Sequence, residues 1–160
     1  MNRLNNSSMQ PNSVPKNISW ALPIVSVLGF ADALYLTVKH YQGVAPSCII
    51  FSGCDTVATS VYATIGPIPV ALLGVIFYFF MLLLSLMYLD RRAKSALVVA
   101  LLVSSVGVLF TLWFLYLQVF VIKAFCVYCI FSAITSITLF FLSLIAVRLL
   151  QQKNSPDPAV

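Results

Sequence analysis

The chain has 160 residues, of which 61% are hydrophobic and 8% are charged. In a soluble domain about 25% of the residues are charged, so this composition excludes an ordinary soluble protein and favours a membrane protein with one domain. The formal net charge of +5 comes from residues scattered between apolar runs. This placement excludes the clustered basic surface of a nucleic-acid-binding protein.

Residues 1–19 are rich in Asn, Ser and Pro and show no hydrophobic periodicity, so we predict a disordered cytoplasmic tail there. Four apolar runs follow, and each is as long as the ~20 residues that a membrane helix requires. The runs cover residues 20–38, 68–89, 96–122 and 124–147. Because they do not alternate between apolar and polar residues, they predict an all-α bundle of four transmembrane helices over residues 20–148 rather than a β-barrel. Residues 149–160 form a second polar tail.

The placement of the basic residues predicts the topology. Seven of the nine Lys and Arg residues lie before the first run, between the second and third, or after the fourth, and two lie on the opposite side. By the positive-inside rule both termini are then cytoplasmic, and all four cysteines face the periplasmic or outer side of the inner (plasma) membrane. A competing interpretation is a cleavable signal peptide, because Ala31-Asp32-Ala33 resembles a cleavage site, but cleavage would leave three helices.

Asp32 is the one residue in the four runs that carries an acidic or basic side chain. Two interpretations of Asp32 stay open. It is either an acid close enough to the outer interface to reach water or a polar contact in a pocket, since ionisable residues in membrane helices usually face the protein interior.

The outer loop, residues 39–67, is predicted to carry a short helix. Asp55 is placed to cap a helix over residues 56–65. That segment is too short and too polar to span the membrane, so we predict that it lies in the interface. Its apolar side would hold Val57, Val61 and Ile65. The Gly and Pro residues at 66–69 then break the chain before the second run.

The four cysteines form two pairs, and neither pair lies in the middle of an apolar run. Cys48 and Cys54 lie in the outer loop, whereas Cys126 and Cys129 form a C-x-x-C at the start of the last run. The free N–H groups at the start of a helix stabilise a thiolate, so Cys126 is predicted to be reactive. Gln118 lies near the outer end of the third run, close to this motif.

Several kinds of site could use four cysteines. We predict no metal, because the loop pair is spaced C-x5-C rather than as a second C-x-x-C of a zinc site. Buried inert cysteines and two structural disulfides in a non-enzymatic membrane protein stay open as alternatives. A thiol–disulfide relay accounts for the position of both pairs, because an exposed loop pair could exchange with a dithiol at membrane depth. A dithiol at that depth suggests a lipid-soluble electron acceptor, namely a quinone.

Four stretches of the chain carry a family resemblance. They are Tyr35-Leu36-Thr37, Gly53-Cys54-Asp55-x-Val57-x-x-Ser60-x-Tyr62-Ala63, Gly66-x-Ile68-Pro69-Val70-x-x-x-Gly74 with Tyr78, and Cys126-x-x-Cys129. In order and spacing, over about residues 20–148, they resemble the bacterial branch of the vitamin K epoxide reductase family.

The resemblance implies a bundle around a quinone of the ubiquinone, menaquinone or vitamin K type, capped by the outer loop and its short helix. It implies that Cys48 and Cys54 are a shuttle pair and that Cys126 and Cys129 are the active-site pair. The candidates for quinone contacts are Ser60, Tyr62, Phe114 and Gln118.

The resemblance also implies a partner protein. Many bacterial members carry a fused thioredoxin-like domain, and this chain ends at Val160, so a thioredoxin-like protein would act in trans on the outer side. Vertebrate members have an Asn before the second helix and a Tyr one turn beyond the C-x-x-C, where this chain has Val70 and Ala133. The implied function is therefore a quinone-dependent thiol–disulfide oxidoreductase that oxidises this partner and so promotes disulfide formation. Vitamin K epoxide reduction is the alternative.

Overall fold

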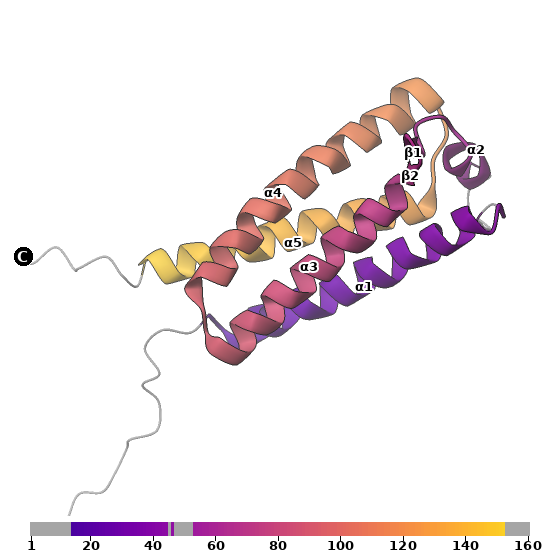
Figure 1. Cartoon of the computed structure of the whole chain (residues 1–160). Helices are drawn as coiled ribbons and strands as arrows, with labels where there is room; N and C mark the ends of the chain where they lie inside the picture. The colour runs from indigo at the N-terminus through magenta and orange to yellow at the C-terminus, as the bar shows by residue number, and fades with distance from the viewer. Residues whose placement is uncertain (1–13, 45, 47–52, 153–160) are drawn as a thin grey trace, which may run out of the picture.

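The computed structural model describes residues 14–44, 46 and 53–152. Its long helices are α1 (Lys16–Tyr41), α3 (Val70–Arg91), α4 (Lys94–Tyr116) and α5 (Val127–Gln152), and a π-helix, η1 (Leu117–Ile122), continues α4. They run side by side as an elongated bundle (Figure 1). Helix α1 packs against α3 and α5, and α4 packs against the same two helices. The predicted four-helix bundle is therefore confirmed.

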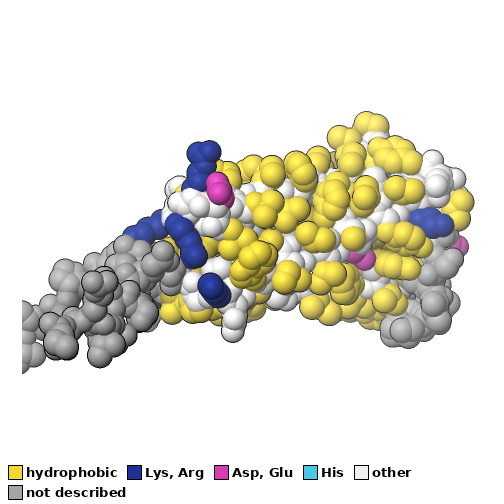
Figure 2. Space-filling model, turned by 90° about the horizontal axis from the view of Figure 1, so that it is seen from below, with side chains coloured by type: hydrophobic (Ala, Val, Ile, Leu, Met, Phe, Trp, Pro, Cys, Tyr) yellow, Lys and Arg dark blue, Asp and Glu magenta, His cyan; other side chains and the backbone are white. Residues whose placement is uncertain are grey.

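The outer surface of the bundle is suited to lipid. In the described part of the chain four helices are long and apolar enough to cross a membrane. Large side chains such as Leu102, Leu109 and Phe120 are exposed rather than packed inside. Figure 2 shows hydrophobic side chains over the flank of the bundle and most of the visible Lys and Arg side chains at one end. The chain is a multi-pass membrane protein.

The interior is closely packed because small residues let the helices approach. A Cβ on Gly29 of α1 would overlap the ring of Tyr78 on α3. Buried hydroxyl groups mostly bond back to their own helix, as Ser26 does to the Leu22 carbonyl at 2.8 Å. Such bonds give a buried hydroxyl its hydrogen-bond partner within its own helix, so it needs no polar partner on a neighbouring helix.

The long helices extend beyond the apolar runs at both ends. Helix α1 begins at Lys16, so residues 16–19, which we assigned to the tail at 1–19, are helical. Helix α5 ends at Gln152 and takes in the first residues of the predicted tail at 149–160. Hydropathy marks the part of a helix that lies in lipid, whereas the backbone hydrogen bonds continue into the interface, where polar side chains are favoured.

The predicted helix over residues 56–65 is wrong in its extent. The structure has α2 (Cys54–Ala58), which begins after Gly53 and has no side-chain cap, so Asp55 is not the N-cap. The Ser60 hydroxyl donates to the Val57 carbonyl at 2.8 Å, and such side-chain bonds to nearby carbonyls favour turns over helix. Because α2 ends at Ala58, the proposed apolar face does not form. Val61 is 83% exposed.

Two short antiparallel strands follow α2 at the same end of the bundle (Figure 1). Strand β1 (Thr64–Ile65) pairs with β2 (Ile68–Pro69), with Ile65 opposite Ile68. The two-residue turn between them contains Gly66, whose φ of +62° lies in the left-handed region that favours glycine. The hairpin leads directly into α3 and, with α2, covers this end of the bundle.

Candidate active site: a dithiol at the wall of an apolar cavity

The C-x-x-C lies where α5 begins. Cys126 immediately precedes the first residue of α5 and is 1% exposed. Its carbonyl accepts the N–H of Ile130 at 3.0 Å, as expected of a residue that starts a helix. Cys129 lies in the first turn of α5 and is half-buried, and both cysteines are free thiols. The predicted placement of this pair at a helix start is confirmed.

Neighbouring groups favour the thiolate form of Cys126. The Cys129 thiol donates a hydrogen bond to the Cys126 sulfur, and this bond lowers the pKa of Cys126 below its ordinary value, to about 7. Burial acts in the opposite direction, whereas the backbone N–H groups of Cys129 and Tyr128 also lower this pKa. At neutral pH a large fraction of reduced Cys126 is therefore thiolate, and a thiol of low pKa is a good leaving group in exchange with a disulfide.

This assignment predicts the pH dependence of alkylation. In the reduced protein, the rate constant for alkylation of Cys126 by iodoacetamide should reach half of its maximum near pH 7. Cys129→Ala removes the hydrogen bond that contributes most, so the midpoint should move upward. Mass spectrometry of the Cys126 peptide gives the rate at each pH. An unchanged midpoint in Cys129→Ala would show that the low pKa has another origin.

The pKa of Cys126 also links its redox state to stability. Because the pKa is lower in the folded than in the unfolded chain, the thiolate contributes to stability above the ordinary thiol pKa. That contribution is lost as the pH falls through about 7. The reduced protein should therefore gain stability between pH 7 and pH 9, whereas the oxidised Cys126–Cys129 form, which has no thiol there, should not.

Gln118 holds the segment that leads into the motif. Its side-chain carbonyl accepts the Cys126 N–H at 3.2 Å, and its backbone carbonyl accepts the N–H of Ala124 at 3.2 Å. Lys123, which lies between Gln118 and Ala124 in the chain, adopts a left-handed conformation with φ of 54° and ends η1. Gln118 is 3% exposed. Its predicted proximity to the C-x-x-C is confirmed, and the contact that the structure gives it is to Cys126 itself.

Cys54 is brought to the same place from the other side. It is the first residue of α2, is 1% exposed and is disulfide-bonded. A Cβ on the preceding Gly53 would lie 2.8 Å from the carbonyl oxygen of Phe125, so α2 begins against the backbone that precedes Cys126. Glycine is needed for this approach. Cys48 lies outside the described residues.

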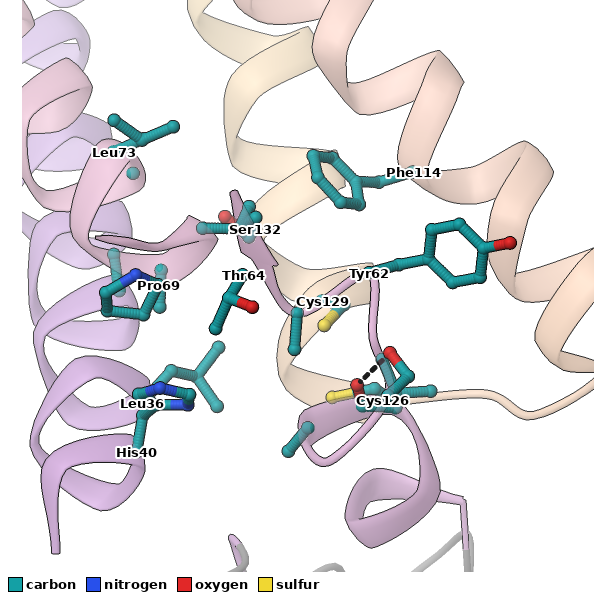
Figure 3. A pocket seen from close by; sticks show the side chains of 18 of the residues that line it. Leu36, His40, Tyr62, Thr64, Pro69, Leu73, Phe114, Cys126, Cys129 and Ser132 are labelled. Carbon is teal, nitrogen blue, oxygen red and sulfur yellow. Dashed lines mark hydrogen bonds between the residues drawn. The ribbon is translucent and has the colours of Figure 1, made fainter. Parts of the chain in front are cut away.

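A cavity of about 810 Å³ opens next to the dithiol. All four long helices and the segment from α2 to β2 contribute to its wall, which is mainly aliphatic and aromatic. Cys126 and Cys129 line it, and so do all four candidates for quinone contacts, Ser60, Tyr62, Phe114 and Gln118. Figure 3 shows the side chains of Cys129 and Phe114 around this space, whereas the Tyr62 hydroxyl points away from Cys129. Contact of the four candidates with a quinone stays a prediction.

Asp32 belongs to the interior rather than to water. It is half-buried, and its Oδ2 atom is shielded from solvent with no hydrogen-bond partner among the described residues. Its charge also raises the pKa of Cys126, although this effect is the smallest of those that act on the thiol. Asp32 is therefore partly turned to the protein interior, but it does not line the cavity, and its Oδ2 makes no polar contact with the described residues.

Sequence reasoning missed a polar cluster deeper in the bundle. The Tyr78 hydroxyl donates to the Ser132 carbonyl at 2.7 Å and lies 2.8 Å from the Thr135 hydroxyl. Ser132 and Ser136 both line the cavity. The available signal was their spacing, because residues three and seven positions after Cys129 share its face of the helix.

The comparison with known families agrees with this arrangement. The family model described as the vitamin K epoxide reductase family matches residues 20–144. This range covers more than half of the chain and includes all four cysteines. A search of the curated proteins finds no match.

Proposed function

We propose, from the premise that this chain belongs to the vitamin K epoxide reductase family, that it is a quinone-dependent oxidoreductase that oxidises a thioredoxin-like partner. The family links thiol oxidoreduction to quinones or vitamin K. One observation carries the proposal: a reduced Cys126–Cys129 pair lies at the wall of a large apolar cavity inside a membrane bundle.

The cavity suits a quinone in size and in chemistry. Pockets for small molecules and cofactors have volumes of about 300–1,000 Å³ and apolar walls with a few placed polar groups. Here the volume is about 810 Å³, and the polar groups in the wall include Ser60 and Gln118. A bound quinone of the ubiquinone, menaquinone or vitamin K type would supply a two-electron acceptor beside the dithiol.

The first half-reaction is the oxidation of the dithiol. Cys126 and Cys129 together lose two electrons and two protons and form a disulfide, and the quinone is reduced to the quinol. The hydrogen bond from Cys129 favours the thiolate form of Cys126, and in that form one of the two protons has left the sulfur before the electrons do. With a quinone in the cavity, the apolar wall would limit the access of water to the reacting sulfurs.

The second half-reaction restores the dithiol. A reduced partner attacks the Cys48–Cys54 disulfide, leaves with its own disulfide and converts this pair to two thiols. Cys54 then attacks Cys126, Cys129 leaves as a thiolate, and Cys48 resolves the Cys54–Cys126 bond. The state that follows has an oxidised Cys54 and a reduced C-x-x-C. The structure has the redox state in which this sequence of steps ends, because Cys54 is disulfide-bonded and both Cys126 and Cys129 are free.

The partner would act from the outer side of the membrane. The Lys and Arg residues of the α3–α4 connection lie at the end of the bundle opposite α2 (Figure 1). The positive-inside rule assigns that end to the cytoplasm, together with both termini. The cysteines would then face the periplasm or another extracytoplasmic space, where disulfides persist. The product would be disulfide bonds in exported proteins.

The test is quinone reduction by the purified full-length protein in detergent. We expect dithiothreitol to drive reduction of short-chain ubiquinone or menaquinone analogues, followed by absorbance. Vitamin K epoxide is assayed in parallel, and faster turnover with the epoxide than with either quinone would favour epoxide reduction proper. No turnover with any of these substrates, on protein of native thermal stability, would favour the alternative of two structural disulfides.

A further inference from the structure

The hydroxyl group of Ser136 stands out among the buried polar atoms of the bundle. Ser136 lies on α5, is 4% exposed and lines the cavity. Its Oγ is shielded from solvent and has no hydrogen-bond partner among the described residues. A buried hydroxyl without a partner destabilises a fold, so such a group calls for an explanation.

One carbonyl oxygen that Ser136 could use is already occupied. A buried serine in a helix can donate to the carbonyl four residues earlier, as Ser85 does to Met81 at 2.7 Å. For Ser136 that acceptor is the carbonyl of Ser132. This oxygen already accepts the Tyr78 hydroxyl at 2.7 Å and lies 2.9 Å from the Thr135 hydroxyl. The cluster around Tyr78 therefore occupies the intrahelical acceptor that Ser136 would otherwise use.

The hydroxyl is instead turned across the bundle. A Cβ on Gly107 of α4 would lie 3.2 Å from the Ser136 Oγ and 2.7 Å from the ring of Phe77. Gly107 and Phe77 line the same cavity as Ser136. The Ser136 hydroxyl thus lies where α3, α4 and α5 meet at the cavity wall. It faces α4 at Gly107, which has no side chain to cover it.

Ser136 also stands in register with the dithiol. It follows Cys129 by seven residues, which is two turns of helix, about 10.5 Å of rise and nearly the same face. Between them lies Ala133, which also lines the cavity and whose small side chain leaves room for a ring. A flat ring that carries oxygen atoms on opposite sides could lie along Ala133, with one edge at Cys129 and the far oxygen at Ser136.

We propose that Ser136 is a substrate-binding residue whose hydroxyl donates a hydrogen bond to the quinone carbonyl remote from Cys129. This inference rests on the proposed function and specifies its substrate as a 1,4-quinone held lengthwise along α5. The hydrogen bond fixes the depth of the ring, so that the edge near Cys129 faces the reacting sulfur.

The test compares two serines on the same helix. Ser143 is also fully buried and without a hydrogen-bond partner among the described residues, but it does not line the cavity. For a short-chain ubiquinone analogue, with dithiothreitol as reductant, Ser136→Ala should raise KM about tenfold and change kcat by less than about threefold, the loss of one hydrogen bond to the substrate. Ser143→Ala should leave both constants unchanged.

Two further measurements separate binding from structure. The thermal stability of the quinone-free Ser136→Ala protein should equal or exceed that of wild type, because the removed hydroxyl had no partner. Quenching of tryptophan fluorescence by the quinone analogue should show the same tenfold loss of affinity as KM. The Thr and Val variants at this position have nearly the same shape, so Ser136→Thr should bind the analogue more tightly than Ser136→Val by a similar factor.

The outcomes distinguish this inference from the function on which it rests. If the wild-type protein reduces quinones and the KM values of Ser136→Ala and Ser143→Ala are equal, the role of Ser136 is overturned and the proposed function stands. Equal affinities of the Thr and Val variants would overturn it as well. A folded wild-type protein that reduces no quinone would overturn both.

Discussion

Cys129→Ser should abolish dithiothreitol-driven quinone reduction, lowering kcat by on the order of 10³-fold or more. Cys129 lines the cavity, and its thiol donates the hydrogen bond that favours the thiolate form of Cys126. A single remaining thiol cannot form an intramolecular disulfide, so it cannot deliver two electrons to one quinone. Cys126→Ser should be equally inactive for the same reason. Absorbance of the quinone analogue gives the rate directly.

Cys54→Ser is the matched control for this loss. It removes a buried cysteine at the same end of the bundle but leaves the C-x-x-C intact. Cys54→Ser should keep dithiothreitol-driven turnover within about threefold of wild type, because the small reductant can reach the C-x-x-C without the loop pair. Turnover in Cys129→Ser within tenfold of wild type would show that electrons reach the quinone without the dithiol.

The number of membrane helices could be predicted because lipid-facing helices admit few polar residues, so four uninterrupted apolar runs mark four spans. Which helices pack against each other in the bundle could not be predicted. A helix that is apolar on all sides has no distinct buried face in its sequence. The packing is decided instead by small contacts such as Gly29 against Tyr78. The π-helix Leu117–Ile122 was likewise hidden, because its sequence continues the apolar run without a break.

The candidate site divides in the same way. Cys126 and Cys129 could be predicted as site residues from their spacing and from their position at the start of the last apolar run. The helix predicted after Asp55 failed because the Ser60 hydroxyl bonds to the Val57 carbonyl, which favours a turn where the helix was expected to continue. Ser136 could not be singled out from the sequence, since its surroundings include a hydrogen bond that Tyr78 makes from another helix to the Ser132 carbonyl.

Cys54→Ser should separate the two half-reactions. Turnover driven by a reduced thioredoxin-like protein should fall at least ~100-fold, while dithiothreitol-driven turnover stays close to wild type. Cys126 is 1% exposed and covered by the start of α2. A folded protein is too large to enter a cavity of about 810 Å³. Its electrons must therefore pass through a cysteine that is exposed to the partner before they reach Cys126.

Cys48→Ser tests the same path from its other end. Cys54 can still attack Cys126 of the oxidised C-x-x-C, but the loop thiol that would resolve the Cys54–Cys126 bond forward is gone, so this mixed disulfide should accumulate with Cys129 as a thiol. Peptide mapping by mass spectrometry identifies the bond. The close approach of Gly53 to Phe125 predicts this linkage and not one from Cys54 to Cys129, which lies a turn further into α5. A Cys54–Cys129 bond, or partner-driven turnover unchanged in both loop variants, would contradict the shuttle role of the loop pair.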